Sequence, residues 1–314
     1  MNKIYFVTGS QDLYGEETLR QAAKDSTVIS GFLNEKLSDI AEVVFMPVVK
    51  TACEAEDICV QASSDKDCIG VIMWMHTFSP AKMWIRALKA LKKPMLHLHT
   101  QFNEKLPYDS IDMDFMNLNQ SAHGDREFGF ICTRLGIKRE VVVGYYRHED
   151  VTEKIRRFAY AASAVAFSRT LRVAMLGNNM RDVAVTDGDR VESEIRFGWN
   201  VNYYGIGDVA DIADSITDSE IEAKMSEYAE KYTMATDNLA AVREQAKYEA
   251  ALDKFIAREK INAFTDTFQD LHGFNQLPGI AAQNLMAKGI GFGPEGDYKT
   301  AALGAVLFKM SRKI

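Results

Sequence analysis

Short apolar runs alternate with amphipathic helical segments along this chain, and the alternation limits the possible folds more than any other feature. The runs with strand character are residues 4–7, 43–49, 69–74 and 95–98. The segments between them with apolar residues at helical spacing are residues 16–37, 54–63 and 79–91. In the last of these, Ser79 is expected as the N-cap and Pro80 as the first helical residue. Short strands that alternate with helices predict a parallel sheet covered on both faces.

The same pattern runs on into a second half. A strand at 141–143 and a helix at 151–167 precede a polar break at residues 168–170, where we place a domain boundary. Beyond it, strands are expected at 173–176 and 199–204, and helices at 219–232, 236–260 and 297–310. A length of 314 residues suits two domains of ordinary size. We predict two doubly wound, three-layer α/β/α domains with mostly parallel sheets, at residues 1–168 and 169–314.

Composition excludes several classes of protein. A formal net charge of -7 argues against nucleic acid as a partner, because nucleic-acid binders usually present a basic face. The longest nearly apolar run, residues 158–167, is far too short to span a membrane. The four cysteines show no C-x-x-C spacing and have the surroundings of reduced core thiols. We therefore expect a cytoplasmic protein with a small polar ligand.

The segment from His99 to Phe130 shows no steady apolar period and is crowded with amides, carboxylates and a histidine. We predict a long irregular loop that serves as a binding wall, since such loops in compact domains are usually functional. Gln120 and His123, near its end, are candidates to bind a sugar hydroxyl. A solvated insertion is the alternative.

Two loops are expected at the carboxyl edge of the first sheet, where open α/β folds bind ligands. Gln11 follows the first strand, and Phe78 follows the third strand after His76 and Thr77. Gln11 can both donate to and accept from a hydroxyl, and Phe78 can form an apolar wall. A plain connecting turn and a core aromatic are the corresponding structural alternatives.

Other polar groups invite a metal interpretation. His97 and His99 lie two apart on one expected strand and share a face, as a metal-binding pair can, although hydrogen-bonded core histidines are the preferred interpretation. Asp112 and Asp114 lack the glycine turn and distal glutamate of a calcium loop. We interpret these two carboxylates as hydrogen-bonding groups of the loop.

The segment Gly291 to Gly296 formally matches the G-x-G-x-x-G pattern of dinucleotide-binding proteins. No clear strand is expected before it, and the residues after it leave no room for the rest of a dinucleotide-binding unit. The segment is better interpreted as presenting Glu295 beside the start of the helix at 297–310. A carboxylate there can bind a divalent cation or move a proton, although an ordinary first-turn acid is the alternative.

At these motifs the sequence resembles the L-arabinose isomerase family. The matching stretches include VTGSQDLYGEETLRQ, MHTFSPAKMWI, NNMRDVAVTDGD and the segment from His99 to Phe130, and they run in order from residue 5 to about residue 303. The resemblance implies a cytoplasmic aldose–ketose isomerase that interconverts L-arabinose and L-ribulose through an enediol, usually uses Mn²⁺ and assembles as a homo-oligomer. A carboxylate base and a cation that polarises the sugar oxygens suit that chemistry.

The resemblance also implies roles for individual residues. Gln11, Leu13, Phe78 and Met180 match residues that line the family's sugar pocket. Gln120 and His123 match residues that reach the pocket of a neighbouring subunit. Glu295 matches a glutamate that binds the metal and serves in acid–base catalysis.

The family continues past the last residue of this sequence into a β-rich domain, absent here, that supplies a second catalytic glutamate and two metal-binding histidines. We therefore expect this chain alone to bind Mn²⁺ weakly and to turn over little or no sugar. Two other functions stay open. One is a non-catalytic sugar-binding or assembly subunit that needs a second polypeptide, and the other is a nicotinamide oxidoreductase that rests on the glycine pattern.

Overall fold

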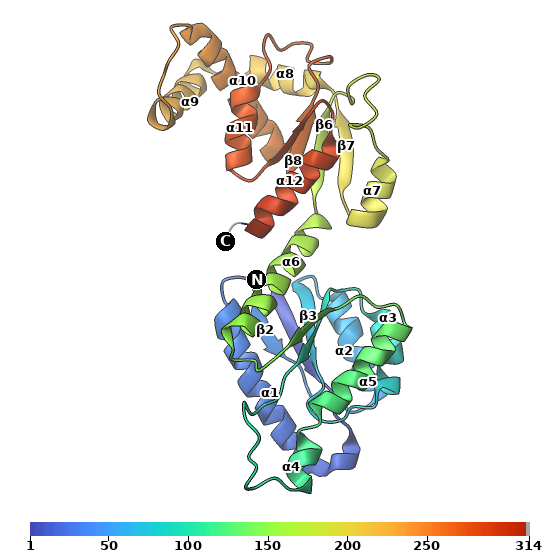
Figure 1. Cartoon of the computed structure of the whole chain (residues 1–314). Helices are drawn as coiled ribbons and strands as arrows, with labels where there is room; N and C mark the ends of the chain where they lie inside the picture. Colours follow the sequence, from blue (N-terminus) through green and yellow to red (C-terminus); the bar gives the residue numbers. More distant parts are fainter. Residues whose placement is uncertain (312–314) are drawn as a thin grey trace. The chain divides into compact units, whose positions relative to one another are not determined.

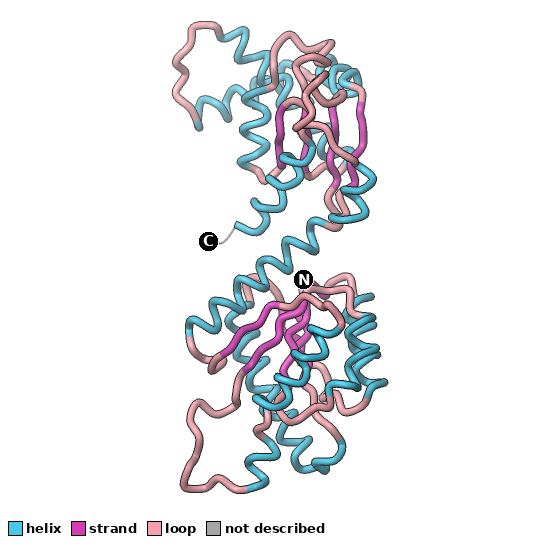
Figure 2. Tube along the Cα trace, turned by 45° about the vertical axis from the view of Figure 1, so that its right-hand side comes forward, coloured by secondary structure: helices cyan, strands magenta, loops and turns pink. Residues whose placement is uncertain are grey.

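The computed structural model describes residues 1–311 and divides into two compact units, Met1–Ser163 and Ala164–Ile314. Each unit is built on one parallel β-sheet with helices on both faces (Figures 1 and 2). The predicted α/β class with parallel sheets is therefore confirmed. The division into units falls inside helix α6 (Glu149–Ser168), whereas the domain boundary at residue 168 stays a prediction.

The first unit holds a five-stranded sheet in the order β2-β1-β3-β4-β5, with every neighbouring pair parallel. Its strands are β1 (Lys3–Thr8), β2 (Glu42–Phe45), β3 (Cys68–Trp74), β4 (Met95–His99) and β5 (Glu140–Val143). Alternate residues of β1 face opposite sides: Tyr5 and Val7 belong to the core cluster beneath α2, α3 and α5. Both faces of this strand are buried, which explains its continuous apolar run.

Helices cover both faces of this sheet. The helical segments of the first unit are η1 (Asp12–Tyr14), α1 (Gly15–Leu37), α2 (Ala52–Ser64), η2 (Ala81–Trp84), α3 (Ile85–Ala90), α4 (Met113–Leu118), α5 (Ser121–Arg134) and most of α6. Thr51 caps α2 in a reciprocal capping box with Glu54, so the start of this helix has its backbone donors satisfied locally.

Two local predictions were wrong in this unit. Within residues 79–91 lie only the short 3₁₀ helix η2 and the helix α3, and Ser79 caps neither of them. Pro80 precedes η2 and is not its first residue. The hydroxyl of Ser79 instead accepts from the buried indole Nε1–H of Trp84 at 2.9 Å. A buried indole N–H needs a hydrogen-bond acceptor, and the Ser79 hydroxyl that fills this role is not available to cap a helix.

The segment from His99 to Phe130 is not a single irregular loop, because it contains α4 and the first ten residues of α5. The buried face of α5 has helical spacing, but small and polar residues carry it: Ser121, Gly124, Asp125, Phe128, Gly129 and Cys132. A search for apolar residues at helical spacing does not detect such a face. Asp112, interpreted as a hydrogen-bonding group of the loop, is the N-cap of α4 and accepts from the backbone N–H of Phe115.

The second unit holds a four-stranded parallel sheet in the order β7-β6-β8-β9. Its strands are β6 (Arg172–Leu176), β7 (Asn200–Tyr204), β8 (Ala263–Asp266) and β9 (Gly291–Pro294). Its helices are α7 (Arg190–Phe197), α8 (Ile206–Asp214), α9 (Asp218–Lys231), α10 (Leu239–Glu259), α11 (Gly279–Ala287) and α12 (Tyr298–Ser311). Strands β8 and β9 are too short and too small in side chain to be recognised by pattern.

The two faces of the second sheet carry separate cores. Ala174 and Leu176 of β6 join the cluster formed with α8, α10 and α11, whereas Val173 and Met175 join the cluster formed with α12. The glycine-rich segment thus lies within β9 and continues through a turn into α12. Gly291 and Gly293 bring β9 against the backbone of α12, because a Cβ at either position would overlap that helix.

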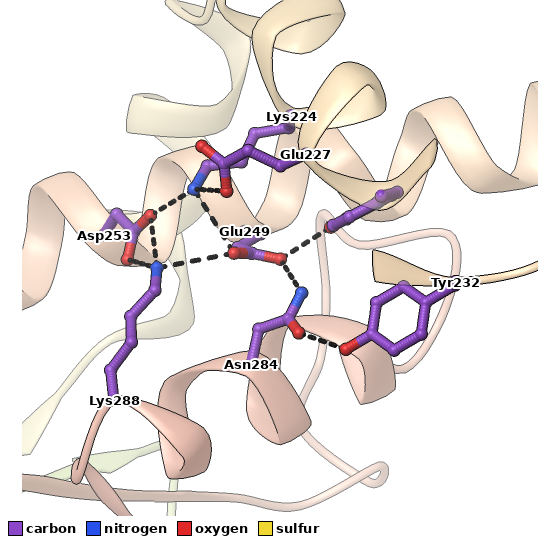
Figure 3. A network of polar contacts seen from close by, with 8 residues as sticks. Lys224, Glu227, Tyr232, Glu249, Asp253, Asn284 and Lys288 are labelled. Atoms are coloured by element: carbon purple, nitrogen blue, oxygen red, sulfur yellow. Dashed lines mark hydrogen bonds and ion pairs between the residues drawn. The ribbon is translucent and has the colours of Figure 1, made fainter. Parts of the chain in front are cut away.

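A buried charge cluster joins α9, α10 and α11 (Figure 3). The carboxylate of Glu249, which is fully buried, accepts from the hydroxyl of Tyr228 at 2.7 Å and from the amide of Asn284 at 2.7 Å. Its other oxygen lies 3.2 Å from Nζ of Lys224 and 3.5 Å from Nζ of Lys288. Because the carboxylate is satisfied on both oxygens, the cluster can stabilise the packing of three helices despite its burial.

No helix within residues 1–311 is both long and apolar enough to cross a membrane. The cysteines are free thiols, and three of them, Cys59, Cys68 and Cys132, are buried as predicted, whereas Cys53 is exposed.

Candidate functional site

The loops that follow β1 and β3 meet at the carboxyl edge of the first sheet. In the strand order β2-β1-β3-β4-β5, β2 lies on one side of β1 and β3 lies on the other. The chain therefore changes its direction across the sheet between β1 and β3, and open α/β sheets bind ligands at such a point. The hydroxyl of Thr77 donates to that of Ser10 at 2.7 Å, which joins the two loops directly. The sequence prediction that these loops are neighbours is confirmed.

Buried residues pack against the two loops at this edge. His76 lies 2.8 Å from the carboxylate of Asp25 on α1 and stacks on Trp74 with ring centroids 4.2 Å apart. Gly9 lies so close to Met75 and Ser79 that a Cβ would come within 2.8 Å of the Ser79 hydroxyl. The loops are therefore held by fully buried contacts rather than by solvent-exposed turns.

Phe78 and His123 lie in contact, with ring centroids 4.4 Å apart. Phe78 is half-buried on the loop after β3, and His123 is exposed on the first turn of α5. The hydroxyl of Ser121 donates to the carbonyl of His76 at 3.4 Å, which docks the start of α5 against the same loop. The structure thus brings together two of the residues that the sequence marked as sugar-binding.

The other predicted sugar-binding residues of this unit lie on the segment after β1 and at the start of α5. Gln11 precedes η1, and its side chain does not cap that helix. Leu13 is 83% exposed, which is high for an apolar side chain. Gln120 precedes α5 and donates from its amide to Asn117 at 3.3 Å.

In the second unit, Met180 and Glu295 lie side by side at the carboxyl edge of the sheet. The backbone N–H of Met180 donates to the carbonyl of Glu295 at 2.9 Å. Glu295 has a φ of 64°, in the left-handed region that few non-glycine residues adopt. The next residue, Gly296, has a φ of 81° and donates its N–H to the carbonyl of Asp266 at 2.9 Å. Two strand ends and a strained turn therefore hold the half-buried Glu295 in place.

A second carboxyl group lies at this edge. Asp266, the last residue of β8, is 7% exposed, and burial raises the pKa of its carboxyl to about 6. Burial disfavours the charged form of a carboxyl that lacks a compensating cation. Sequence patterns did not mark this residue, because β8 itself was not predicted.

His97, His99 and Asp125 form a third group, in the first unit. Nε2 of His97 lies 2.8 Å from Oδ1 of Asp125, and Nε2 of His99 lies 3.0 Å from Nδ1 of His97. One ligand atom from each residue lies within 4.8 Å of the other two, as a metal site requires. Burial lowers the pKa of His97 and raises the pKa of Asp125, which keeps the imidazole neutral. The structure is compatible with both interpretations given above for these histidines, namely hydrogen-bonded core residues and a metal-binding pair.

Comparisons with known proteins assign both units. Residues 1–170 match the L-arabinose isomerase N-terminal domain, and residues 172–313 match the L-arabinose isomerase central domain. The chain belongs to the L-arabinose isomerase family. The chain is 51% identical over 307 residues to an L-arabinose isomerase of Geobacillus thermodenitrificans and 49% identical over 303 residues to one of Thermotoga petrophila.

These alignments cover 96% of this chain but 62% and 61% of the two relatives. The chain therefore spans about 62% of the length of the L-arabinose isomerases that it matches. Family membership supports an enzyme family of the isomerase class. The glycines Gly291 and Gly293 of the G-x-G-x-x-G segment, which suggested a nicotinamide oxidoreductase, pack β9 against α12.

The described residues do not form a closed Mn²⁺ site around Glu295. Such a cation takes several protein ligands, and Glu295 belongs to no group of three or more ligand-type side chains within residues 1–311. In this part of the chain, the group that the structure does bring together is the one around Asp125. Sequence patterns did not reveal the group of His97, His99 and Asp125, because they predict a loop in the place of α5, the helix that positions Asp125.

Proposed function

We propose that this chain provides part of an aldose–ketose isomerase that converts L-arabinose to L-ribulose through an enediol. Its membership of the L-arabinose isomerase family supports the proposal, as do the isomerase names of its relatives. The structural observation that carries it is the hydrogen bond from the backbone N–H of Met180 to the carbonyl of Glu295, which fixes the backbone of this half-buried glutamate at the edge of the second sheet.

The proposed roles of the side chains follow from their chemistry. Glu295 moves a proton between C1 and C2 of the open-chain sugar, a transfer that needs a carboxylate held in one position. Gln11, Gln120 and His123 bind sugar hydroxyls by hydrogen bonds. The apolar groups that complete sugar binding are Leu13, Phe78 and Met180. Homo-oligomer formation, with Gln120 and His123 reaching a neighbouring subunit, and a cytoplasmic location complete this proposal.

We propose Mn²⁺ as the cofactor of the whole protein, with Glu295 as one ligand. Because Glu295 belongs to no group of three or more ligand-type side chains among the described residues, further ligands have to come from elsewhere, and the isolated 314-residue chain should bind Mn²⁺ weakly and produce little or no L-ribulose. The lack of such a group also favours the second candidate function, a sugar-binding or assembly subunit that acts with another polypeptide.

L-Ribulose formation tests these proposals. The purified chain is assayed with L-arabinose and Mn²⁺, alone and co-expressed with the unmatched C-terminal part of the Geobacillus thermodenitrificans relative. We expect product only from the pair, and its loss in Glu295→Gln. If the chain alone forms L-ribulose and Glu295→Gln abolishes this activity, the proposal that the metal site of the chain is incomplete is wrong. A folded pair without product would contradict the isomerase proposal, and L-arabinose binding by that pair in calorimetry would then support the sugar-binding subunit.

A further inference from the structure

We propose that His97 and His99 bind a divalent d-block cation such as Zn²⁺, with Asp125 orienting His97, at a site within the first unit. The proposal does not depend on isomerase activity. It rests on the geometry of the three side chains, on an unpartnered buried oxygen and on the cavity beside them.

The first argument is the convergence of two imidazoles. His97 and His99 lie two apart on β4, so that both side chains point to the same face of the sheet. Their facing nitrogens are 3.0 Å apart, and only one proton can occupy the space between them. A Zn²⁺ ion at roughly 2.0–2.1 Å from each nitrogen holds two neighbouring ligands about 3 Å apart, so a small rotation of the half-buried His99 ring suffices to admit it.

The second argument comes from Asp125 on α5. Its Oδ1 lies 2.8 Å from Nε2 of His97, the contact by which a carboxylate orients a metal-binding histidine. Because this contact uses Nε2, Nδ1 of His97 is the nitrogen that faces His99 and is available to a cation. Asp125 is only 1% exposed, so that the contact that orients the His97 ring is shielded from water.

The third argument is access. A cavity of about 380 Å³ opens beside the group, and His99 and Asp125 both line it. Gln101, from the same wall, contributes a buried oxygen, Oε1, that has no partner among residues 1–311. A cation held by the two imidazoles can complete its coordination with this oxygen and with water or a small ligand from the cavity.

The ligand set also selects the class of cation. Imidazole ligands suit Zn²⁺, Co²⁺ and Ni²⁺, whereas Mn²⁺ and Mg²⁺ favour carboxylate, carbonyl and water oxygens. Two imidazole nitrogens therefore favour Zn²⁺ or Co²⁺ over Mn²⁺. A preference of this kind separates the site experimentally from one that contains Glu295.

Co²⁺ serves as the probe, because its visible absorption reports nitrogen ligands and low coordination number. The full chain is titrated with Co²⁺, bound metal is counted by equilibrium dialysis, and Zn²⁺ or Mn²⁺ is then added as competitor. We expect about one Co²⁺ per chain, displaced by Zn²⁺ but not by an equal concentration of Mn²⁺. We expect His99→Ala and the shape-conserving Asp125→Asn each to weaken binding at least tenfold.

His148→Ala is the matched control, because His148 is an exposed histidine of the same unit that also pairs with a carboxylate, Glu104. Its Co²⁺ affinity should equal that of the unchanged chain. Absence of saturable binding would overturn the proposal, as would binding that is lost in His148→Ala or kept in both His99→Ala and Asp125→Asn. Circular dichroism of each variant confirms that it is folded, and two site variants keep the test informative if one of them is not.

Discussion

The backbone N–H of Met180 donates to the carbonyl of Glu295 at 2.9 Å, although the two residues follow different strands of the second sheet. This bond places the loop after β6 against the turn after β9. Gly296 makes the approach possible, because a Cβ there would overlap Asn179 and lie 2.8 Å from the carbonyl oxygen of Asn178. The backbone position of Glu295 therefore depends on a residue that has no side chain.

Gly296→Ala should destabilise the second unit by at least about 1–3 kcal/mol, because alanine would be strained at a φ of 81° and would also clash. Urea unfolding followed by circular dichroism measures the loss. Gly304→Ala is the control, since a Cβ on this exposed helical glycine would make only an ordinary 3.9 Å contact with Cα of Gly291, and the helix should gain up to about 1 kcal/mol. Equal effects of the two substitutions would show that the turn tolerates a side chain.

Glu249→Gln should lower the free energy of unfolding by about 3 kcal/mol. The substitution removes the negative charge from a fully buried cluster and leaves the ammonium groups of Lys224 and Lys288 with fewer partners. Glu222→Gln on α9, which removes an exposed pairing with Arg243, should change it by less than about 1 kcal/mol. A loss at Glu249 no larger than that at Glu222 would mean that the cluster does not stabilise the helices.

Asp266 should make stability fall as pH rises. The folded state holds the carboxyl proton up to about pH 6, whereas the unfolded chain releases it near pH 4, so unfolding becomes easier between these values. A shift of about two pKa units corresponds to about 3 kcal/mol. Asp266→Asn cannot ionise, and its stability relative to the unchanged chain should therefore rise by about that amount from pH 4 to pH 7. Urea unfolding of both proteins across this range measures it, and a pH-independent difference would refute the expectation.

Ser79→Ala should cost about 1–3 kcal/mol, because it leaves the buried indole N–H of Trp84 without an acceptor. A double-mutant cycle with Trp84→Phe tests the cause. If the hydroxyl serves the indole, the cost of Ser79→Ala shrinks in the Trp84→Phe background. If the cost stays the same in both backgrounds, the hydroxyl serves another group, such as a helix N-terminus.

Sequence patterns predicted the elements whose burial follows a simple period. Strands β1, β3 and β6 are apolar on both faces, and helices α1 and α10 carry apolar stripes, so the α/β class and the parallel sheets followed from them. Helix α5 was missed, because its buried face consists of small and polar residues. Strand β9 was missed because glycine and proline carry no strand preference.

The candidate site divides in the same way. Glu295 and Phe78 could be found because they follow elements that a pattern reveals, or because they match a family motif. Asp125 and Asp266 could not, since a buried carboxyl looks like any surface acid until the element that buries it is known. The left-handed conformation of Glu295 is likewise set by its neighbours in space.

The backbone contact between β9 and α12 limits which residues of related chains can change during evolution. Gly291 and Gly293 face Ala301 and Asp297 so closely that neither position can accept one additional carbon atom. Exposed residues of α12 can change without this constraint, and so can Glu295 in a descendant that does not need the function proposed for it. The two glycines should be retained in such a descendant, because any chain that packs this helix on this strand has to keep them.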